Sequence, residues 1–276
     1  MGQLDVLVHL RRYDGEPAAA RAACLLAART PAHLHGLYVA PIPPAAFTSP
    51  ETVAVLVHES DRRFQEARDA GAWWQGLLQA HAAAGEWHVA LADPLDAIGH
   101  AARWCDLVVV ERPMQNPDAP VGWGLASRSV FDAGTPVLVV PDTAQLSSLG
   151  ERVLVAWNGS REAARAVHGA LPLLARAEQV LVLDGGNEAE SGAMLQLPRF
   201  DLAAALKRHG VRAEFRRFAP GGGSARATDL LDAARAAQAD LIVMGAWGHS
   251  RLTELVLGGI TRQMFQSSDL PLLVAH

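Results

Sequence analysis

The feature that most constrains the fold is a series of short apolar runs, each followed by an alanine-rich segment of helical character. The runs "DVLVHL" and "RVLVAW" each precede such a segment, which we expect to be helical over residues 16–28 and 160–175. Later in each half, "CDLVVVERP" and "ADLIVMGAW" are followed by "TPVLVVP" and "LPLLVAH". Aligning Asp106 with Asp240 also aligns Gly124 with Gly258, Arg128 with Arg262, and Phe131 with Phe265. These matches indicate an internal duplication.

Each half alternates predicted strands with helices, beginning and ending on a strand. Strands separated by helices need right-handed crossovers, which give a parallel sheet with helices on both faces. The sequence therefore predicts an α/β protein of two tandem Rossmann-like domains, each an open parallel sheet of strand order 3-2-1-4-5. We expect the first domain over residues 1–143 and the second over residues 150–276, joined by a polar linker from Asp142 to Glu151.

The composition argues against several functional classes. Half of the 276 residues are hydrophobic and the net charge is -5, with no basic run interleaved with aromatics, so we expect no nucleic-acid partner. Lys207 is the only lysine, which excludes a Walker phosphate loop. Cys24 and Cys105 lack CxxC partners, so we expect both to be buried in a reducing compartment. With no apolar run of membrane-spanning length and no leader pattern, we expect a cytoplasmic protein without a membrane partner.

A glycine-rich segment, "MGAWGHSRLTELVLGG", follows a buried strand of the second half. It contains Gly245, Gly248, Gly258 and Gly259. In an open parallel sheet of this order, ligands bind at the carboxyl ends of strands one and four, where the winding direction reverses. Glycines let backbone amides approach an anion closely, and the N-terminus of the following helix favours negative charge. The segment therefore indicates a phosphate-binding loop.

This segment, followed by a short helix and "DLPLLVAH", resembles the universal stress protein family, and the resemblance covers both halves in the manner of its tandem members. Nucleotide-binding members carry G-x2-G-x9-G-[S/T] here, which this chain matches except at the last position. The resemblance implies binding of ATP or AMP, with Mg²⁺ accompanying ATP. It implies contacts to the phosphates from Gly245, Gly248, Gly258, Gly259 and the amide of Ile260, to the ribose from Met244, and to the adenine and ribose from Ala156, Asn158 and the loop near Gly185.

Two positions depart from the family pattern. Asn158 stands where binders usually have aspartate, and Gly259 stands where they have serine or threonine. Losing one hydroxyl bond to a charged oxygen costs about 1.5–3 kcal/mol, although Thr261 could supply a hydroxyl. Two alternatives remain open: the glycines only permit a tight strand-to-helix loop, or Trp157 and Trp247 fill the crevice instead of stacking on a base.

The equivalent segment of the first half, "ERPMQNPDAPVGWGLASRS", retains Gly124 but has lost the other features. Glu111 and Met114 replace the first two glycines, and three prolines remove amide donors. We expect this half to bind no ATP in the same way and to support the second half. Because single-domain family members commonly pair through their last strands, we expect "TPVLVVP" and "LPLLVAH" to pair within the chain; a further homodimer is left open.

No catalytic or metal-binding residue can be identified. There is no G-x-S-x-G or HExxH motif, and we expect histidines such as His33 and His35 to be separate surface side chains. The tryptophans of the first half are expected to pack in the core or an interface. The sequence thus predicts a non-catalytic nucleotide-binding sensor in the stress response, with at most slow ATP hydrolysis. The alternatives are a nucleotide-free scaffold that recruits partner proteins and an enzyme of the related adenine-nucleotide hydrolase-like fold.

Overall fold

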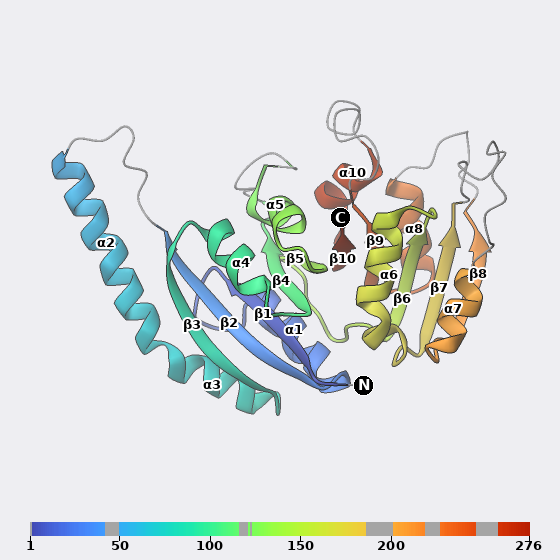
Figure 1. Cartoon of the computed structure of the whole chain (residues 1–276), viewed down its shortest axis with the longest axis horizontal. Coiled ribbons are helices and arrows are strands. Elements are labelled where there is room, and N and C mark those ends of the chain that lie inside the picture. The colour runs from blue at the N-terminus through green and yellow to red at the C-terminus, as the bar shows by residue number, and fades with distance from the viewer. Residues whose placement is uncertain are drawn as a thin grey trace.

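The computed structural model describes residues 2–41, 50–115, 121, 123–185, 201–218, 227–246 and 259–276. They form one ten-stranded sheet with helices on both faces, strongly twisted from one end to the other (Figure 1). The strands of the first half are β1 (Leu4–Leu10), β2 (Ala32–Pro41), β3 (Ala84–Ala92), β4 (Leu107–Arg112) and β5 (Val137–Pro141). Those of the second half are β6 (Arg152–Trp157), β7 (Gln179–Asp184), β8 (Ala213–Arg217), β9 (Leu241–Gly245) and β10 (Leu272–Ala275).

The helices lie between these strands, as the alternation in the sequence predicts. In the first half they are α1 (Ala18–Arg29), α2 (Pro50–Asp69), α3 (Gly71–Ala80), α4 (Pro94–Ala102) and α5 (Leu125–Asp132). In the second half they are α6 (Arg161–Leu174), α7 (Leu202–Arg208), α8 (Ala227–Ala236) and α10 (Ile260–Ser267).

The strand order is β3-β2-β1-β4-β5-β10-β9-β6-β7-β8. Each half therefore has the predicted order 3-2-1-4-5 with parallel pairing throughout. The two halves meet where β5 and β10 pair antiparallel, with Leu138 opposite Leu273. The predicted pairing of the last strands is confirmed, and it covers a strand edge that each half would otherwise expose.

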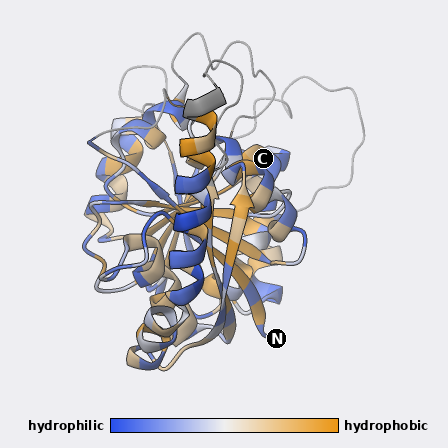
Figure 2. Ribbon diagram, turned by 90° about the vertical axis from the view of Figure 1, so that its left-hand side faces the viewer, coloured by the Kyte–Doolittle hydropathy of each residue, from blue (hydrophilic) through white to orange (hydrophobic). Residues whose placement is uncertain are grey.

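Two apolar cores, one on each face of the sheet, stabilise this arrangement. One core packs the strands against α1, α3, α6 and α7, with buried residues such as Cys24, Trp74 and Ala166. The other packs them against α4, α5, α8 and α10, with residues such as Ile98 and Phe265. In Figure 2 the strands are mostly hydrophobic, whereas the helices combine hydrophobic and hydrophilic residues. Since each core draws on both halves, the two repeats are packed as one body.

The first half departs from the second in its long excursion after β2. The sequence predicts one long helix carrying Trp73 and Trp74, but the structure breaks it at Ala70 into α2 and α3. Helix α3 packs Trp74 over Gly36, where an added Cβ would lie 2.8 Å from the indole. Much of α2 extends beyond the sheet (Figure 1).

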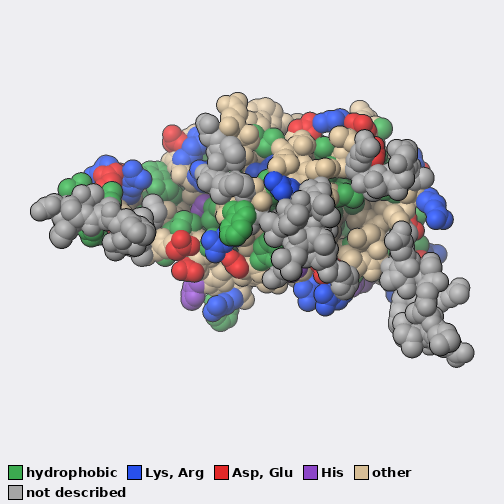
Figure 3. Space-filling view, turned by 90° about the horizontal axis from the view of Figure 1, so that it is seen from above, with side chains coloured by type: hydrophobic (Ala, Val, Ile, Leu, Met, Phe, Trp, Pro, Cys, Tyr) green, Lys and Arg blue, Asp and Glu red, His purple; other side chains and the backbone are tan. Residues whose placement is uncertain are grey.

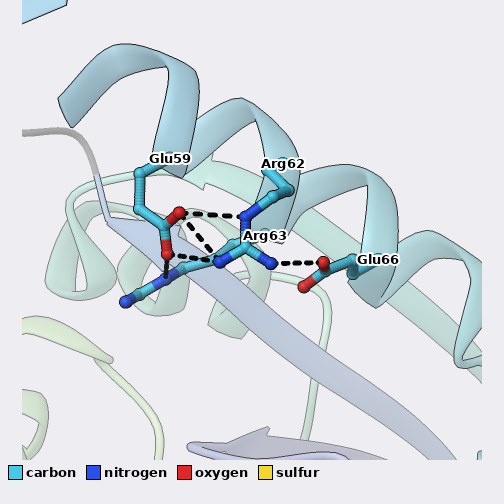
Figure 4. Close-up of polar contacts among 4 residues, drawn as sticks. All are labelled: Glu59, Arg62, Arg63 and Glu66. Atoms are coloured by element: carbon cyan, nitrogen blue, oxygen red, sulfur yellow. Dashed lines mark hydrogen bonds and ion pairs between the residues drawn. The ribbon is translucent and has the colours of Figure 1, made fainter. Parts of the chain in front are cut away.

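The exposed part of α2 carries a network of ion pairs between side chains one turn apart. Arg62 contacts Glu59 at 2.7 Å and Glu66 at 2.5 Å, and Arg63 contacts Glu59 at 2.8 Å (Figure 4). The bonds from the two arginines lower the pKa of Glu59. Such spacing is typical of a solvent-exposed helix that is stabilised along its own surface.

Equivalent aspartates hold the start of the sheet in each half. Asp106, just before β4, accepts a hydrogen bond from the amide of Asp5 at 2.9 Å. Asp240, just before β9, accepts from Ser148 Oγ and from the amides of Gly150, Glu151 and Arg152, at 2.7–3.2 Å. The duplicated aspartate thus has the same role twice, and in the second half it also fixes the end of the linker.

Two expectations from the sequence need adjustment, those for Cys105 and for two of the tryptophans. Cys24 is buried as predicted, and burial raises its pKa to about 12, whereas Cys105 is only half-buried. Trp104 and Trp123 are 80% and 67% exposed, so these two tryptophans are not core residues. They follow α4 or precede α5, outside the helical positions that face the sheet. In the described ranges, no helix combines the length and the apolar character needed to cross a membrane.

Candidate functional site

The candidate site of the second half lies at the carboxyl ends of β6 and β9, which are neighbours in the sheet. Ala156 pairs with Met244 one residue before each strand ends. Helix α6, which follows β6, packs on one face of the sheet, and α10, which follows β9, packs on the other. The winding direction therefore reverses between these two strands, as the sequence predicts, and a crevice at such a point is where α/β sheets bind ligands.

At the end of β6, backbone and side chain are tied into a turn. The exposed Asn158 accepts a hydrogen bond at Oδ1 from the amide of Ser160, at 3.1 Å, and Ser160 Oγ accepts from the amide of Ala163 at the start of α6, at 3.1 Å. Gly185, at the end of β7, donates its amide to the carbonyl of Trp157 at 2.8 Å. The Gly185 amide is therefore occupied within the protein.

Gly245 has a packing role that the sequence alone does not reveal. A Cβ at this position would lie 2.5 Å from the backbone nitrogen of Ala163 and 3.0 Å from Cβ of Glu162. No side-chain rearrangement relieves a clash with the helix backbone. The missing side chain at Gly245 therefore lets the first turn of α6 approach the end of β9.

Helix α10 begins at the edge of the same site. Gly259 occupies its N-cap with φ -54° and ψ 163°, and no side chain of the described residues caps the helix. Ile260 is half-buried, and Thr261 is only 5% exposed. Gly248, Gly258 and Trp247, which the sequence places in the glycine loop, lie outside the described residues.

Glu162 is a charged residue of this site that the sequence interpretation missed. It is 4% exposed, and its Oε2 has no hydrogen-bond partner among the described residues. The other carboxylate oxygen, Oε1, lies 3.5 Å from Nη2 of Arg161. Its place in the first turn of α6, two residues after the cap Ser160, is the signal that could have identified it, because acidic residues favour that turn.

The first half fills the equivalent place with its own carboxylate. Glu111, the counterpart of Gly245 at the end of β4, is 6% exposed and accepts a hydrogen bond at Oε1 from the amide of Ala19 at the start of α1, at 3.2 Å. Pro17, at the N-cap of α1, makes no side-chain cap. The Glu111 carboxylate therefore accepts a hydrogen bond from the N-terminus of α1. This is the half in which the sequence predicts that the phosphate site has been lost.

Arg112, which follows Glu111, joins this edge to the second half. Its guanidinium donates to the carbonyl of Ser268, just after α10. Burial lowers the pKa of Arg112 to about 10, and the neighbouring Asp142 counteracts part of this shift. Arg112 was also missed from the sequence, although a charged pair, Glu111 and Arg112, at the end of the otherwise apolar strand β4 is a signal of a specific role.

On the side of the molecule seen from above in Figure 3, basic and acidic side chains are interspersed among the described residues. Among the described residues visible on that side, the figure shows no extended patch of one charge.

The structure corrects the expectation that the histidines are separate. His33 and His35 on β2 lie beside His88 and Glu86 on β3, and their rings are in contact, with centroids 4.9 Å apart for His33 and His35 and 5.5 Å for His35 and His88. The sequence shows His33 and His35 on one strand face, but the register with β3 was needed to add the other two. This cluster lies near the amino-terminal ends of the strands, away from the site of the second half.

Comparison with known proteins identifies a family and solved structures that this chain resembles. Residues 150–276 match the model of the universal stress protein family. A universal stress protein from Archaeoglobus fulgidus DSM 4304 is similar over 99% of this chain and 96% of its own, with 15% identity and a TM-score of 0.70. A putative universal stress protein from Pseudomonas aeruginosa UCBPP-PA14 is similar over 99% and 93%, with 15% identity and a TM-score of 0.56. No curated protein matches the chain.

At these identities the two structures establish the fold, including the union of two repeats in one chain, and nothing about a ligand. The family match and the fold confirm the resemblance drawn from the glycine-rich segment. Residues 150–276 therefore carry the universal stress protein domain, and the first half has the same five-strand fold.

Proposed function

We propose that the second half binds an adenine nucleotide, ATP or AMP, and that the protein acts as a non-catalytic sensor in the stress response. The observation that supports this most is the position of Gly245, beside the switch point and in the half that matches the family. The first half, whose equivalent position holds Glu111, is proposed to bind no nucleotide there.

The binding groups proposed are backbone amides and a few small side chains. Gly245, Gly248, Gly258, Gly259 and the amide of Ile260 would contact the phosphates, with Thr261 nearby. Met244 would lie beneath the ribose, and Ala156, Asn158 and Gly185 would border the base and ribose. The uncapped start of α10 supports this arrangement, since a helix N-terminus favours an anion. When ATP is bound, Mg²⁺ would screen the phosphates from Glu162.

The arrangement favours binding over turnover. In the part of the chain that the structure describes, the residues at this edge include no histidine–carboxylate pair poised to activate a water molecule. We therefore propose hydrolysis that is slow at most. We also propose that the protein acts in the cytoplasm.

Thermal unfolding with and without ATP or AMP tests the proposal. A nucleotide at 100 times its Kd should stabilise the native chain by about 2.7 kcal/mol. Gly248→Val should abolish this shift, because a branched side chain would displace the phosphates. The matched change Gly124→Val, in the corresponding loop of the first half, should leave the nucleotide-induced shift intact.

A gain-of-function variant keeps the test independent of folding damage. Gly259→Ser restores the hydroxyl that family binders have, and should tighten nucleotide binding by roughly tenfold to a hundredfold, since a bond to a charged oxygen contributes about 1.5–3 kcal/mol. If millimolar nucleotide leaves both the native chain and this variant unshifted, the nucleotide proposal is wrong and the scaffold function is favoured.

A further inference from the structure

We propose that the first half carries a binding site for a divalent transition-metal ion of the zinc type, formed by His33 and His35 on β2 with Glu86 and His88 on β3. The two histidines of β2 are two residues apart and share one face of the sheet, as do Glu86 and His88 on β3. Because His35 is directly opposite Glu86 in the register, the four side chains converge over one pair of strands.

The distances within the cluster are close to those that a metal requires. Nδ1 of His35 lies 3.3 Å from Nε2 of His88. A tetrahedral ion with metal–nitrogen bonds of 2.0–2.1 Å separates its ligand atoms by about 3.3 Å. The Glu86 carboxylate lies 3.9 Å from Nε2 of His33 and 3.7 Å from Nε2 of His88. Ligand atoms of His33, His35 and Glu86 lie within 4.8 Å of one another, so small rotamer changes would close them on one ion.

Asp5 orients the central histidine toward the cluster. Its Oδ1 lies 3.1 Å from Nε2 of His35, and its own amide is held by Asp106 at 2.9 Å. When His35 donates Nε2–H to this carboxylate, the Nδ1 lone pair faces His88 and is available to a metal. A carboxylate behind a ligating histidine is the usual support of a metal site, because it fixes the tautomer and raises the basicity of the ring.

The chemistry of the donors favours zinc, nickel or copper over calcium or magnesium. Imidazole nitrogens suit the former group, whereas the latter prefer oxygen ligands. Burial and, to a lesser extent, the neighbouring His35 lower the pKa of His88, while Glu86 partly opposes this shift. The side chains remain 24–63% exposed, so an ion can reach them directly from solvent.

The site has no counterpart in the second half. The strand pairings align His33 with Gln179, His35 with Leu181, Glu86 with Glu214 and His88 with Arg216. There Arg216 contacts Glu214 at 2.7 Å, which occupies the carboxylate with an internal cation. The cluster is therefore a feature of one repeat and is not imposed by the fold.

The test is calorimetric titration of the full-length chain with Zn²⁺ after treatment with a chelator. We expect each chain to bind one Zn²⁺ ion tightly. His35→Gln and His33→Gln should each weaken it at least tenfold, because each removes a ligand. The control His209→Gln, at the exposed end of α7 in the second half, should bind as the native chain does.

Asp5→Asn tests whether the cluster is organised to bind a metal ion or consists only of neighbouring side chains. It keeps every ligand but removes the orienting carboxylate, and should weaken Zn²⁺ binding by about tenfold to a hundredfold. Unfolding temperatures measured in chelator establish that each variant is folded, and Glu86→Gln serves if a histidine variant is not. The proposal would be overturned if the native chain bound no Zn²⁺ ion tightly. It would also be overturned if the His33, His35 and Glu86 variants bound Zn²⁺ as tightly as the native chain.

Discussion

The two halves share a five-strand plan, yet they differ at both ends of their strands. At the carboxyl ends, the Glu111 carboxylate of the first half accepts a hydrogen bond from the start of α1. The equivalent position of the second half is Gly245, which has no side chain. Near the amino ends, the first half gathers three histidines, and the second half has an arginine–glutamate pair at the aligned positions.

This comparison shows which parts of a duplicated fold are free to change. The residues that face the two cores remain apolar in both copies, because a buried polar substitution there would be costly. Strand ends border solvent or a helix terminus, so a glycine, a carboxylate or an imidazole can stand there without disrupting a core. The copies have therefore kept one architecture while their strand ends acquired different chemistry.

The largest expected effect tests the duplicated aspartates. Asp240→Ala should destabilise the chain by about 3 kcal/mol or more, because its carboxylate accepts bonds from Ser148 and three amides of the linker and β6. Asp106→Ala, at the exposed counterpart, should cost about 1 kcal/mol, since one amide depends on its side chain. Urea unfolding of both variants measures the difference. Equal losses would show that the linker contacts contribute little.

Gly245→Ala is expected to have the next largest effect. A single methyl group would meet the backbone of α6, which cannot move aside without disturbing the core, so we expect a loss of about 1–3 kcal/mol. Gly76→Ala is the control, because nothing lies within 4 Å of a Cβ there and alanine favours the interior of α3. A thermal melt of Gly245→Ala indistinguishable from the native one would contradict the packing role.

Glu111→Gln should have the smallest effect of the three. The amide oxygen can still accept from Ala19, but the negative charge at the start of α1 is lost, which should cost about 1 kcal/mol. Glu178→Gln, at an exposed position of the second half, should change the free energy of unfolding by less than about 0.5 kcal/mol. Denaturant midpoints compare the two. A neutral result at Glu111 would mean that its charge does not stabilise α1.

The architecture could be predicted from the sequence because its signals are local and repeated. Runs such as "DLVVV" and "DLIVM" identify central strands buried on both faces, and the order of strands and helices leaves few topologies. The break at Ala70 was missed because no proline or strong turn signal separates α2 from α3, and the packing of Trp74 over Gly36 shows where the chain turns.

The candidate site was predicted less completely. The switch point follows from topology, so Ala156 and Met244 could be placed at strand ends from the sequence. Glu162, Arg112 and the partners of His35 depend on contacts between segments far apart in the chain, and no periodicity encodes these. Likewise, the close approach of α6 to Gly245 is set by the angle at which the helix crosses the sheet, which the sequence does not specify.

The antiparallel junction of β5 and β10 has one more consequence. In a dimer of identical subunits, symmetry repeats every mutation on both sides of the contact, so a change must be tolerated twice. Here the same kind of contact lies within a single polypeptide. Dilution cannot separate its two sides, and an altered residue on one side has no mirror image on the other. This asymmetry gives evolution two lobes to modify independently while their union persists.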